Sequence, residues 1–424
     1  MAVSAASVAR AVGSPILLSW EKLTTGVSYD LLSPKVQADP YEVYRQMRMK
    51  DPVHWSELAR AWFLTRYAEV ASVLKDTRFS VEGTQQKSNE RMGYKLDERS
   101  PLRRINKRWM LFVDPPDHTR LRGLVNRAFT PKAVEGLRPK IQELVDGLID
   151  QVQDRGHMDI VHDLGDPLPA KVLAYLLGLP SEDSAVLKPW ADVVGMGIDP
   201  ILAPDVVARI NAVILEAGAY FEHHIDMRRK NPTDDLLSSL ISVEEQGERL
   251  SSDELLSLLF LFLAAGTETT TNLTCNGLFT ILRHPDQLER LRNDPSLIES
   301  AIEEFLRYET PVQVTGRVAH EDVEVGGKII RKGQPVGLLL GAANRDPDQF
   351  PDPDRLDIGR TPNRHDAFSF GIHFCVGAPL GRAEAAIAIG TVLRRLPNLK
   401  LQSTTPQWRP TMNNRGLQTL PVTF

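Results

Sequence analysis

Cysteine is scarce in this sequence, which has only Cys275 and Cys375 among 424 residues. Secreted proteins of this length rarely rely on one possible bridge, so the pair favours a reducing compartment, the cytoplasm. The first twenty residues carry a single arginine, and Gly-Ser-Pro at 13–15 interrupts their short apolar stretch. They make a poor signal peptide, and we expect none to be used.

Long hydrophobic runs and a strong charge of one sign are also missing. The longest apolar run, Leu255 to Ala265 with only Ser257 interrupting, is about half a membrane span and suits a buried helix. The 50 basic and 55 acidic residues give a net charge of −5. That balance argues against nucleic acid or an acidic membrane as partner.

Helical periodicity dominates what is present, and strand signals are few and short. Helices are predicted at Pro40–Lys50, Tyr67–Lys75, His118–Phe129, Pro131–Gln153, Asp205–Lys230, Ser251–Arg283, Pro285–Asp294, Ser296–Tyr308 and Ala378–Arg395. Strands are predicted at His54–Glu57, Ala61–Thr65, Val323–Val325, Pro335–Leu340 and Thr419–Phe424, and loops at Glu82–Arg99 and Gln246–Ser252. Since no repeat or linker marks a boundary, we expect one mainly α domain with small β-sheets over 1–424, in which 1–38 is poorly specified.

The most informative stretch is the glycine-punctuated loop from Phe368 to Pro379, which delivers Cys375 to the start of a helix. Gly371 and Gly377 permit unusual backbone conformations there. Backbone N–H groups and the helix N-terminus can then face the sulfur, which favours the thiolate and suits a metal ligand.

Other uses of cysteine fit Cys375 less well. A buried, inert thiol is the ordinary role, and mid-helix Cys275 suits it. A nucleophile with His373 as its base is disfavoured, because the two residues are only two positions apart in a tight loop. A zinc site needs four ligands, and no second Cys/His pair has suitable spacing.

The pattern F-x-x-G-x-H-x-C-x-G at Phe368, Gly371, His373, Cys375 and Gly377 resembles the haem-binding signature of the cytochrome P450 superfamily. The resemblance implies the P450 fold, with haem b between the long central helix and the helix after the cysteine loop. It also implies that Cys375 is the thiolate ligand of the iron.

Two further motifs resemble that family in the expected order. Glu304 and Arg307 match its E-x-x-R pair, whose side chains share one helix face. Arg355, in the segment Pro353–Leu356, matches the residue that gives a second arginine to the same carboxylate, although the family usually has Phe where this chain has Leu356. These three charged residues are the predicted structural ion network.

The segment Ala265–Thr270 resembles the oxygen-activation motif of the family. Gly266 weakens the helix, and the hydroxyl of Thr269 can compete for the carbonyl of Ala265 four residues earlier. The resemblance implies that Glu268 and Thr269 are catalytic and deliver protons to reduced O₂.

The remaining site residues follow from matched segments. Haem propionates need cationic or hydrogen-bonding partners. Those implied are His118, Arg122, Arg317 and His373, and the other residues implied to contact haem are Ala265, Phe368, Gly371 and Gly377. The implied substrate pocket includes the loop region at roughly Thr84–Met110 and the residues Leu261, Ala264, Val312 and Val314. Its apolar lining favours a hydrophobic or amphipathic small molecule.

The implied enzyme is a soluble bacterial-type monooxygenase, suited to secondary metabolism. It would insert one oxygen atom from O₂, take electrons from a separate ferredoxin and its NAD(P)H-dependent reductase, and act as a monomer. A peroxide-driven haem-thiolate enzyme and a non-catalytic haem sensor remain alternatives, and Glu268 and Thr269 argue against both.

The sequence also contains two groups of basic residues whose roles depend on where the fold places them. Arg103, Arg104, Lys107 and Arg108 either form solvated surface or meet an acidic substrate. Because the net charge of −5 would repel an acidic ferredoxin, docking requires a local basic patch. The predicted patch consists of Arg120, Arg127, Lys132, Arg364 and Arg382.

Overall fold

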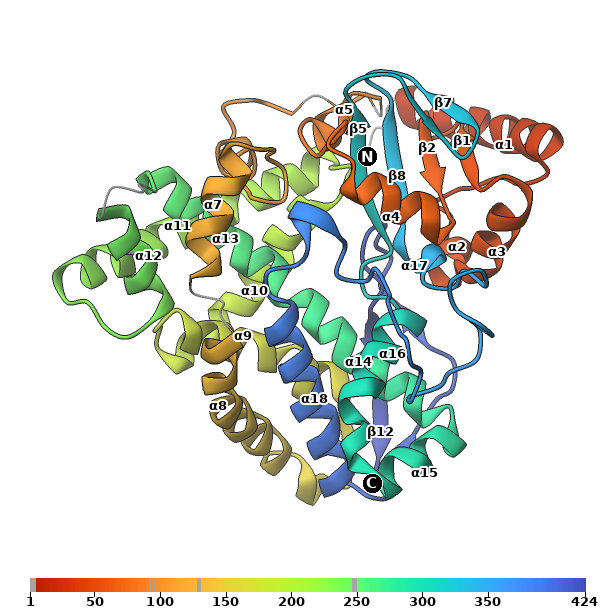
Figure 1. Ribbon diagram of the computed structural model, residues 1–424. Helices are drawn as coiled ribbons and strands as arrows, with labels where there is room; N and C mark the ends of the chain where they lie inside the picture. The colour runs from red at the N-terminus through yellow and green to blue at the C-terminus, as the bar shows by residue number, and fades with distance from the viewer. Residues whose placement is uncertain (1–4, 92, 95, 128–130, 246–249) are drawn as a thin grey trace.

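A large helical part and a smaller part around a five-stranded sheet make up the fold, as a computed structural model shows (Figure 1). The structure describes residues 5–91, 93–94, 96–127, 131–245 and 250–424. Its α-helices are α1 Ala5–Thr25, α2 Pro34–Ala38, α3 Tyr41–Lys50, α4 Tyr67–Lys75, α5 Thr84–Arg91, α6 Pro101–Asn106, α7 Asp117–Asn126, α8 Pro131–Asp150, α9 Pro167–Leu176, α10 Ser184–Gly195, α11 Pro204–Lys230, α12 Leu236–Glu245, α13 Ser252–Gly266, α14 Glu268–Leu282, α15 Pro285–Asn293, α16 Ile298–Tyr308, α17 Leu340–Ala343 and α18 Ala378–Arg395.

The main sheet has the strand order β1-β2-β8-β5-β3, in which only β2 and β8 pair in parallel. A three-stranded sheet has the order β4-β12-β9, and β6–β7 and β10–β11 form two-stranded sheets. The strands are β1 Val53–Ser56, β2 Ala61–Leu64, β3 Phe79–Ser80, β4 His157–Asp159, β5 Val314–Ala319, β6 Val323–Val325, β7 Lys328–Ile330, β8 Pro335–Leu339, β9 Lys400–Leu401, β10 Gln407–Trp408, β11 Leu417–Thr419 and β12 Pro421–Thr423.

The core is organised around α13 and α14, which run through the helical part in succession. α14 packs against α16 and α18, and its apolar residues join those helices and α8 in one buried cluster. α13 packs against α6 and α10 within a second cluster. Burial on all sides explains why the apolar run of α13 has no polar face. No helix in the described part of the chain is long and apolar enough to cross a membrane.

Several predicted elements are confirmed, and α4 and α18 have the predicted bounds to the residue. A capping box formed by Ser251 and Glu254 begins α13. The long helix is not one piece, because it breaks at Thr267. The predicted loop 82–99 is wrong in part, since it contains α5. That helix has no apolar residue and so gave no periodic signal. Parts of two predictions, at 128–129 and 246–249, lie outside the described residues.

Candidate active site

The cysteine loop is held in place by backbone contacts. The N–H of Cys375 donates to the carbonyl of Phe368 at 2.9 Å. Gly371 has a φ of +71°, and a Cβ there would lie 2.8 Å from the carbonyl oxygen of Leu74 on α4. Only glycine fits this conformation and this close approach. Gly371 therefore anchors the loop against α4 rather than lining the cavity described below.

The two cysteines lie in different surroundings. Cys375 lines a large cavity, whereas Cys275 is 1% exposed within the core around α14. Burial raises the pKa of both thiols. At Cys375 the backbone N–H of Gly377 and the charge of Arg122 oppose that rise without cancelling it. Burial thus outweighs the backbone N–H groups that were predicted to favour the thiolate, and a bound metal cation would supply further positive charge.

A cavity of about 540 Å³ lies between the cysteine loop and the break between α13 and α14, and most of its lining is apolar. All four predicted pocket residues line it, as do Ala265, Phe368 and Gly377. The sequence did not predict two other parts of the lining. One is N-terminal, from Tyr29–Leu32 and the β1–β2 turn, and the other comes from α9. Neither region resembles a motif, so only the fold brings them to the site.

The helix break supplies polar groups to this cavity. The hydroxyl of Thr269 donates to the carbonyl of Ala265 at 2.9 Å, as the i−4 spacing predicts. Thr270 makes the corresponding bond to Gly266 at 3.4 Å. A Cβ on Gly266 would meet nothing within 4 Å, so the cavity reaches the backbone at this point. The helix break thus places two threonines, Thr269 and Thr270, in the cavity wall.

Glu268 turns away from the cavity lining into a neighbouring polar region. Its Oε2 accepts a hydrogen bond from Nδ2 of Asn414 at 2.9 Å. Burial raises the pKa of Glu268, although Arg409 and Asn414 oppose the shift. Burial and then the charge of Glu268 also raise the pKa of Asp199, to about 7. Burial thus favours the protonated form of both carboxyl groups.

Four predicted cofactor-binding residues meet at one edge of the cavity, where they fit the two propionates of a haem. The rings of His118 and His373 lie 4.3 Å apart, and Arg122 and Arg317 line the cavity beside them. Arg317 is 3% exposed, and its Nη2 has no hydrogen-bond partner. Burial, followed by the charge of Arg317, lowers the pKa of His373 to about 3. An edge this rich in cationic donors suits an anionic ligand.

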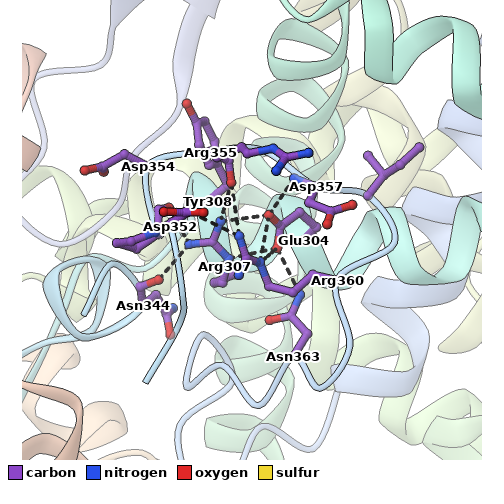
Figure 2. Close-up of polar contacts among 12 residues, drawn as sticks. Glu304, Arg307, Tyr308, Asn344, Asp352, Asp354, Arg355, Asp357, Arg360 and Asn363 are labelled. Atoms are coloured by element: carbon purple, nitrogen blue, oxygen red, sulfur yellow. Dashed lines mark hydrogen bonds and ion pairs between the residues drawn. The ribbon is translucent and has the colours of Figure 1, made fainter. Parts of the chain in front are cut away.

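The ion network is confirmed for Glu304 and Arg307 and wrong for Arg355. Two nitrogens of Arg307 lie 2.7 and 2.8 Å from the Glu304 carboxylate, and the second arginine on it is Arg360, with Nε 3.2 Å from Oε2 (Figure 2). Arg355 contributes only its carbonyl oxygen, which accepts from Arg307 and Arg360. Its side chain is exposed, while the adjacent Leu356 is 2% exposed in the core.

The basic run at 103–108 lies on the outer surface. Arg103 is 3.1 Å from Glu98, while Arg104 and Arg108 both pair with Asp253. Lys107 is exposed, and none of the four side chains lines the cavity. Of the two roles considered for this run, the structure supports solvated surface.

Comparison with known proteins agrees with this geometry. The family model "Cytochrome P450" matches residues 203–424. The chain is 41% identical over 388 residues to the "Biotin biosynthesis cytochrome P450" of Bacillus subtilis (strain 168), covering 91% of this chain and 96% of that protein. It is 40% identical to the "Vitamin D(3) 25-hydroxylase" of Pseudonocardia autotrophica over 95% of this chain and 98% of that one.

Solved structures show the same fold. P450BioI in complex with hexadec-9Z-enoic acid ligated acyl carrier protein has a TM-score of 0.86 and 40% identity, with 92% of this chain and 100% of that chain covered. Myxobacterial CYP267B1 in complex with myristic acid has a TM-score of 0.85 and 43% identity, with 93% and 98% covered.

These features define a haem-thiolate protein, in which a cysteine loop faces a broken helix across a cavity. The chain belongs to the cytochrome P450 family. It is a P450 monooxygenase, an oxidoreductase that binds haem b.

Proposed function

We propose that this enzyme inserts one oxygen atom from O₂ into a hydrophobic or amphipathic small molecule, using electrons from a separate ferredoxin and its NAD(P)H-dependent reductase. The observation that carries the proposal is the acid–alcohol pair Glu268 and Thr269, placed at a helix break beside the cavity that contains Cys375. Neither a peroxide-driven enzyme nor a haem sensor needs such a pair.

Haem b, when bound, supplies the iron at which O₂ is reduced. Cys375 would hold that iron, and the edge formed by His118, Arg122, Arg317 and His373 would hold the propionates. The unpartnered Nη2 of Arg317 supports this assignment, because a buried donor without a partner is costly. By holding the propionates, these four residues would also determine which part of the cavity remains for the substrate.

Proton delivery would fall to the residues of the helix break. Thr269 presents its Oγ1 to the cavity and holds it in place by donating to Ala265. Glu268 keeps a proton at higher pH than an exposed glutamate, because burial raises its pKa. Asn414 fixes the position of its Oε2. In the proposed mechanism Glu268 would supply protons from the polar side of the helix break toward the Thr269 hydroxyl.

Two observations support an amphipathic, lipid-like substrate. The cavity is large and mostly apolar, and it extends from the cysteine loop to Tyr29–Leu32. Similar proteins are described with long-chain or polycyclic ligands: hexadec-9Z-enoic acid ligated acyl carrier protein for P450BioI, myristic acid for CYP267B1, and testosterone for CYP109E1.

The donor would dock over the cysteine loop, where Ile372 and Phe374 are 47% and 39% exposed. Lys75 lies 5.1 Å from the ring centroid of Phe370, and exposed Arg364 accepts from Tyr67 through its carbonyl oxygen. Arg382 serves this role poorly, because its guanidinium is paired with Glu303 at 2.6 Å. Arg120 is likewise paired, with Glu254. From the predicted patch the docking proposal keeps Arg364, and it adds Lys75, which was not predicted.

We further place the enzyme in the cytoplasm, as one P450 domain that acts as a monomer. Its two cysteines are free thiols, which supports a reducing compartment. Relatives match over more than nine-tenths of the chain, which supports a single domain.

Isotope-labelled turnover tests the proposed reaction. The holoenzyme is given NADPH, a ferredoxin, its reductase, ¹⁸O₂ and a substrate found by a shift of the haem absorption. We expect one ¹⁸O atom per product molecule and no product when either redox protein is omitted. Product formed only with added peroxide would support the peroxide-driven alternative, and binding without any product would support the sensor.

A further inference from the structure

Arg91 is a positive charge at the cavity wall without a partner among the described residues. It is the last residue of α5 and lines the cavity near Tyr29–Leu32 and the β1–β2 turn. No hydrogen bond or ion pair of its side chain occurs in the described part of the chain. Arg103 and Arg104, on the outer surface, each have an acidic partner instead.

Buried side-chain amides hold the helix that carries Arg91 in place. Gln85 donates to the carbonyls of Gly197 and Asp199 at 2.7 and 2.9 Å. Asn89 donates to the carbonyl of Pro200 at 3.1 Å and accepts from the N–H of Leu202 at 2.8 Å. Both side chains are at most 5% exposed, so these bonds fix α5 against the segment between α10 and α11.

A stripe of polar residues on α5 also runs along the cavity. Thr84, Ser88 and Arg91 have the spacing i, i+4 and i+7, and all three line the cavity. Thr84 also faces Gly316 on β5, where a Cβ would lie 3.6 Å away, and α5 lies beside β5 (Figure 1). A fixed backbone therefore aims this stripe, and Arg91 at its end, into the cavity.

The surroundings of Arg91 favour an anion. Burial, followed by the charge of Arg60, lowers the pKa of Arg91 to about 10, so the side chain stays charged at neutral pH. The carboxylates that line the same cavity are Asp30 and Glu384. Asp30 accepts from the N–H of Leu32, and it makes no ion pair with Arg91 in the described part of the chain. A half-buried cation facing an apolar cavity gains most from an anionic ligand.

We propose that Arg91 binds the carboxylate of an amphipathic substrate, whose apolar chain extends past Leu261, Ala264 and Val314 toward the cysteine loop. This inference rests on the proposed function and names its substrate class. Binding at Arg91 would hold one end of the substrate away from the reacting carbon. The length of the substrate chain would then determine which carbon is oxidised.

Matched acid and alcohol ligands test the proposal. Dissociation constants for dodecanoic acid and 1-dodecanol are measured with the holoenzyme from the shift of the haem absorption, which needs no turnover. We expect the acid to bind about tenfold more tightly than the alcohol, as one charge-assisted contact allows. Arg91→Gln should weaken the acid about tenfold and leave the alcohol within about twofold, which removes the preference.

Two variants serve as controls. Arg91→Lys keeps the charge and should retain most of the preference for the acid. Arg104→Gln removes a cation that is paired on the outer surface, and it should change neither constant. Equal affinity of the wild type for acid and alcohol, equal weakening of both in Arg91→Gln, or failure of the acid to bind would each overturn the proposal. Because absorption reports binding alone, a failure of the proposed oxygenation would appear separately, in the labelled-oxygen experiment.

Discussion

The Nε of Arg360 lies 3.2 Å from Oε2 of Glu304, so one fully buried carboxylate is shared by two arginines. The amide of Asn363 and the N–H of Asp357 donate to the same carboxylate (Figure 2). Four groups from the loop at 351–363 and from α16 thus converge on one negative charge. This point ties the loop that leads to the cysteine to the helical core.

Replacement of Arg360 by Gln should destabilise the enzyme by about 3 kcal/mol, because it removes a cation from a buried carboxylate. The variant should also release haem sooner on heating. Arg355→Gln is the matched control, since its side chain is exposed, and it should change the free energy of unfolding by less than about 0.5 kcal/mol. Denaturant unfolding of the three proteins measures both effects, and equal losses in the two variants would contradict the assignment.

Replacement of Cys375 by Ala should abolish the red-shifted absorption band of the reduced carbon monoxide complex, which is characteristic of thiolate-bound haem. Cys275→Ala should keep that band, because Cys275 is buried in the core and does not line the cavity. It should lower stability by about 1–2 kcal/mol through a small cavity. The opposite pattern would show that the ligand is misassigned.

Replacement of Thr269 by Ala should leave haem and substrate binding intact while a severalfold larger share of electrons ends in hydrogen peroxide. The reason is that the variant loses the hydroxyl that faces the cavity at the helix break. Thr269→Ser retains this hydroxyl and should stay close to the wild type. Parallel measurement of NADPH consumed, product and peroxide decides the matter, and unchanged coupling in Thr269→Ala would remove the residue from proton delivery.

Motifs with fixed spacing could be predicted from the sequence, because their geometry is local. Glu304 and Arg307 meet within one helix turn, and Thr269 reaches Ala265 for the same reason. Arg360 could not be predicted, because the path of an irregular loop decides which of its arginines turns inward. The resemblance placed the segment at 84–110 along the pocket, but the orientation of Arg91 could not be predicted. Its helix α5 consists of polar residues and is held by its own side-chain amides, which donate to carbonyls of the chain after α10.

Glu384 provides a test by pH. It is 2% exposed on α18, its Oε2 has no partner, and burial raises its pKa to about 8. In the unfolded chain its pKa is about 4.3, so the folded state holds the extra proton between these values. Stability contributed by this group is therefore fully present below about pH 4 and is lost as pH rises toward 8. Glu384→Gln should exceed the wild type in stability by on the order of 3 kcal/mol at pH 7 and by about 1 kcal/mol at pH 5. A pH-independent difference in unfolding free energy would contradict this.

The donor surface over the cysteine loop yields the last prediction. Lys75 and Arg364 flank exposed Ile372 and Phe374, and positive charge at this place would attract an acidic ferredoxin despite the overall charge of −5. Lys75→Glu and Arg364→Glu should slow reduction by ferredoxin several-fold at low salt. They should also flatten its salt dependence, because salt screens charges beyond about 10 Å at roughly 0.1 M.

Lys400→Glu is the control, since this exposed residue lies on β9 beyond the far end of α18. It changes the net charge equally and should leave reduction nearly unchanged. Stopped-flow reduction at several salt concentrations measures all three variants, and substrate affinity should stay constant throughout. Equal slowing in Lys400→Glu would mean that net charge, rather than this surface, governs the encounter, and the docking site would have to be sought elsewhere on the enzyme.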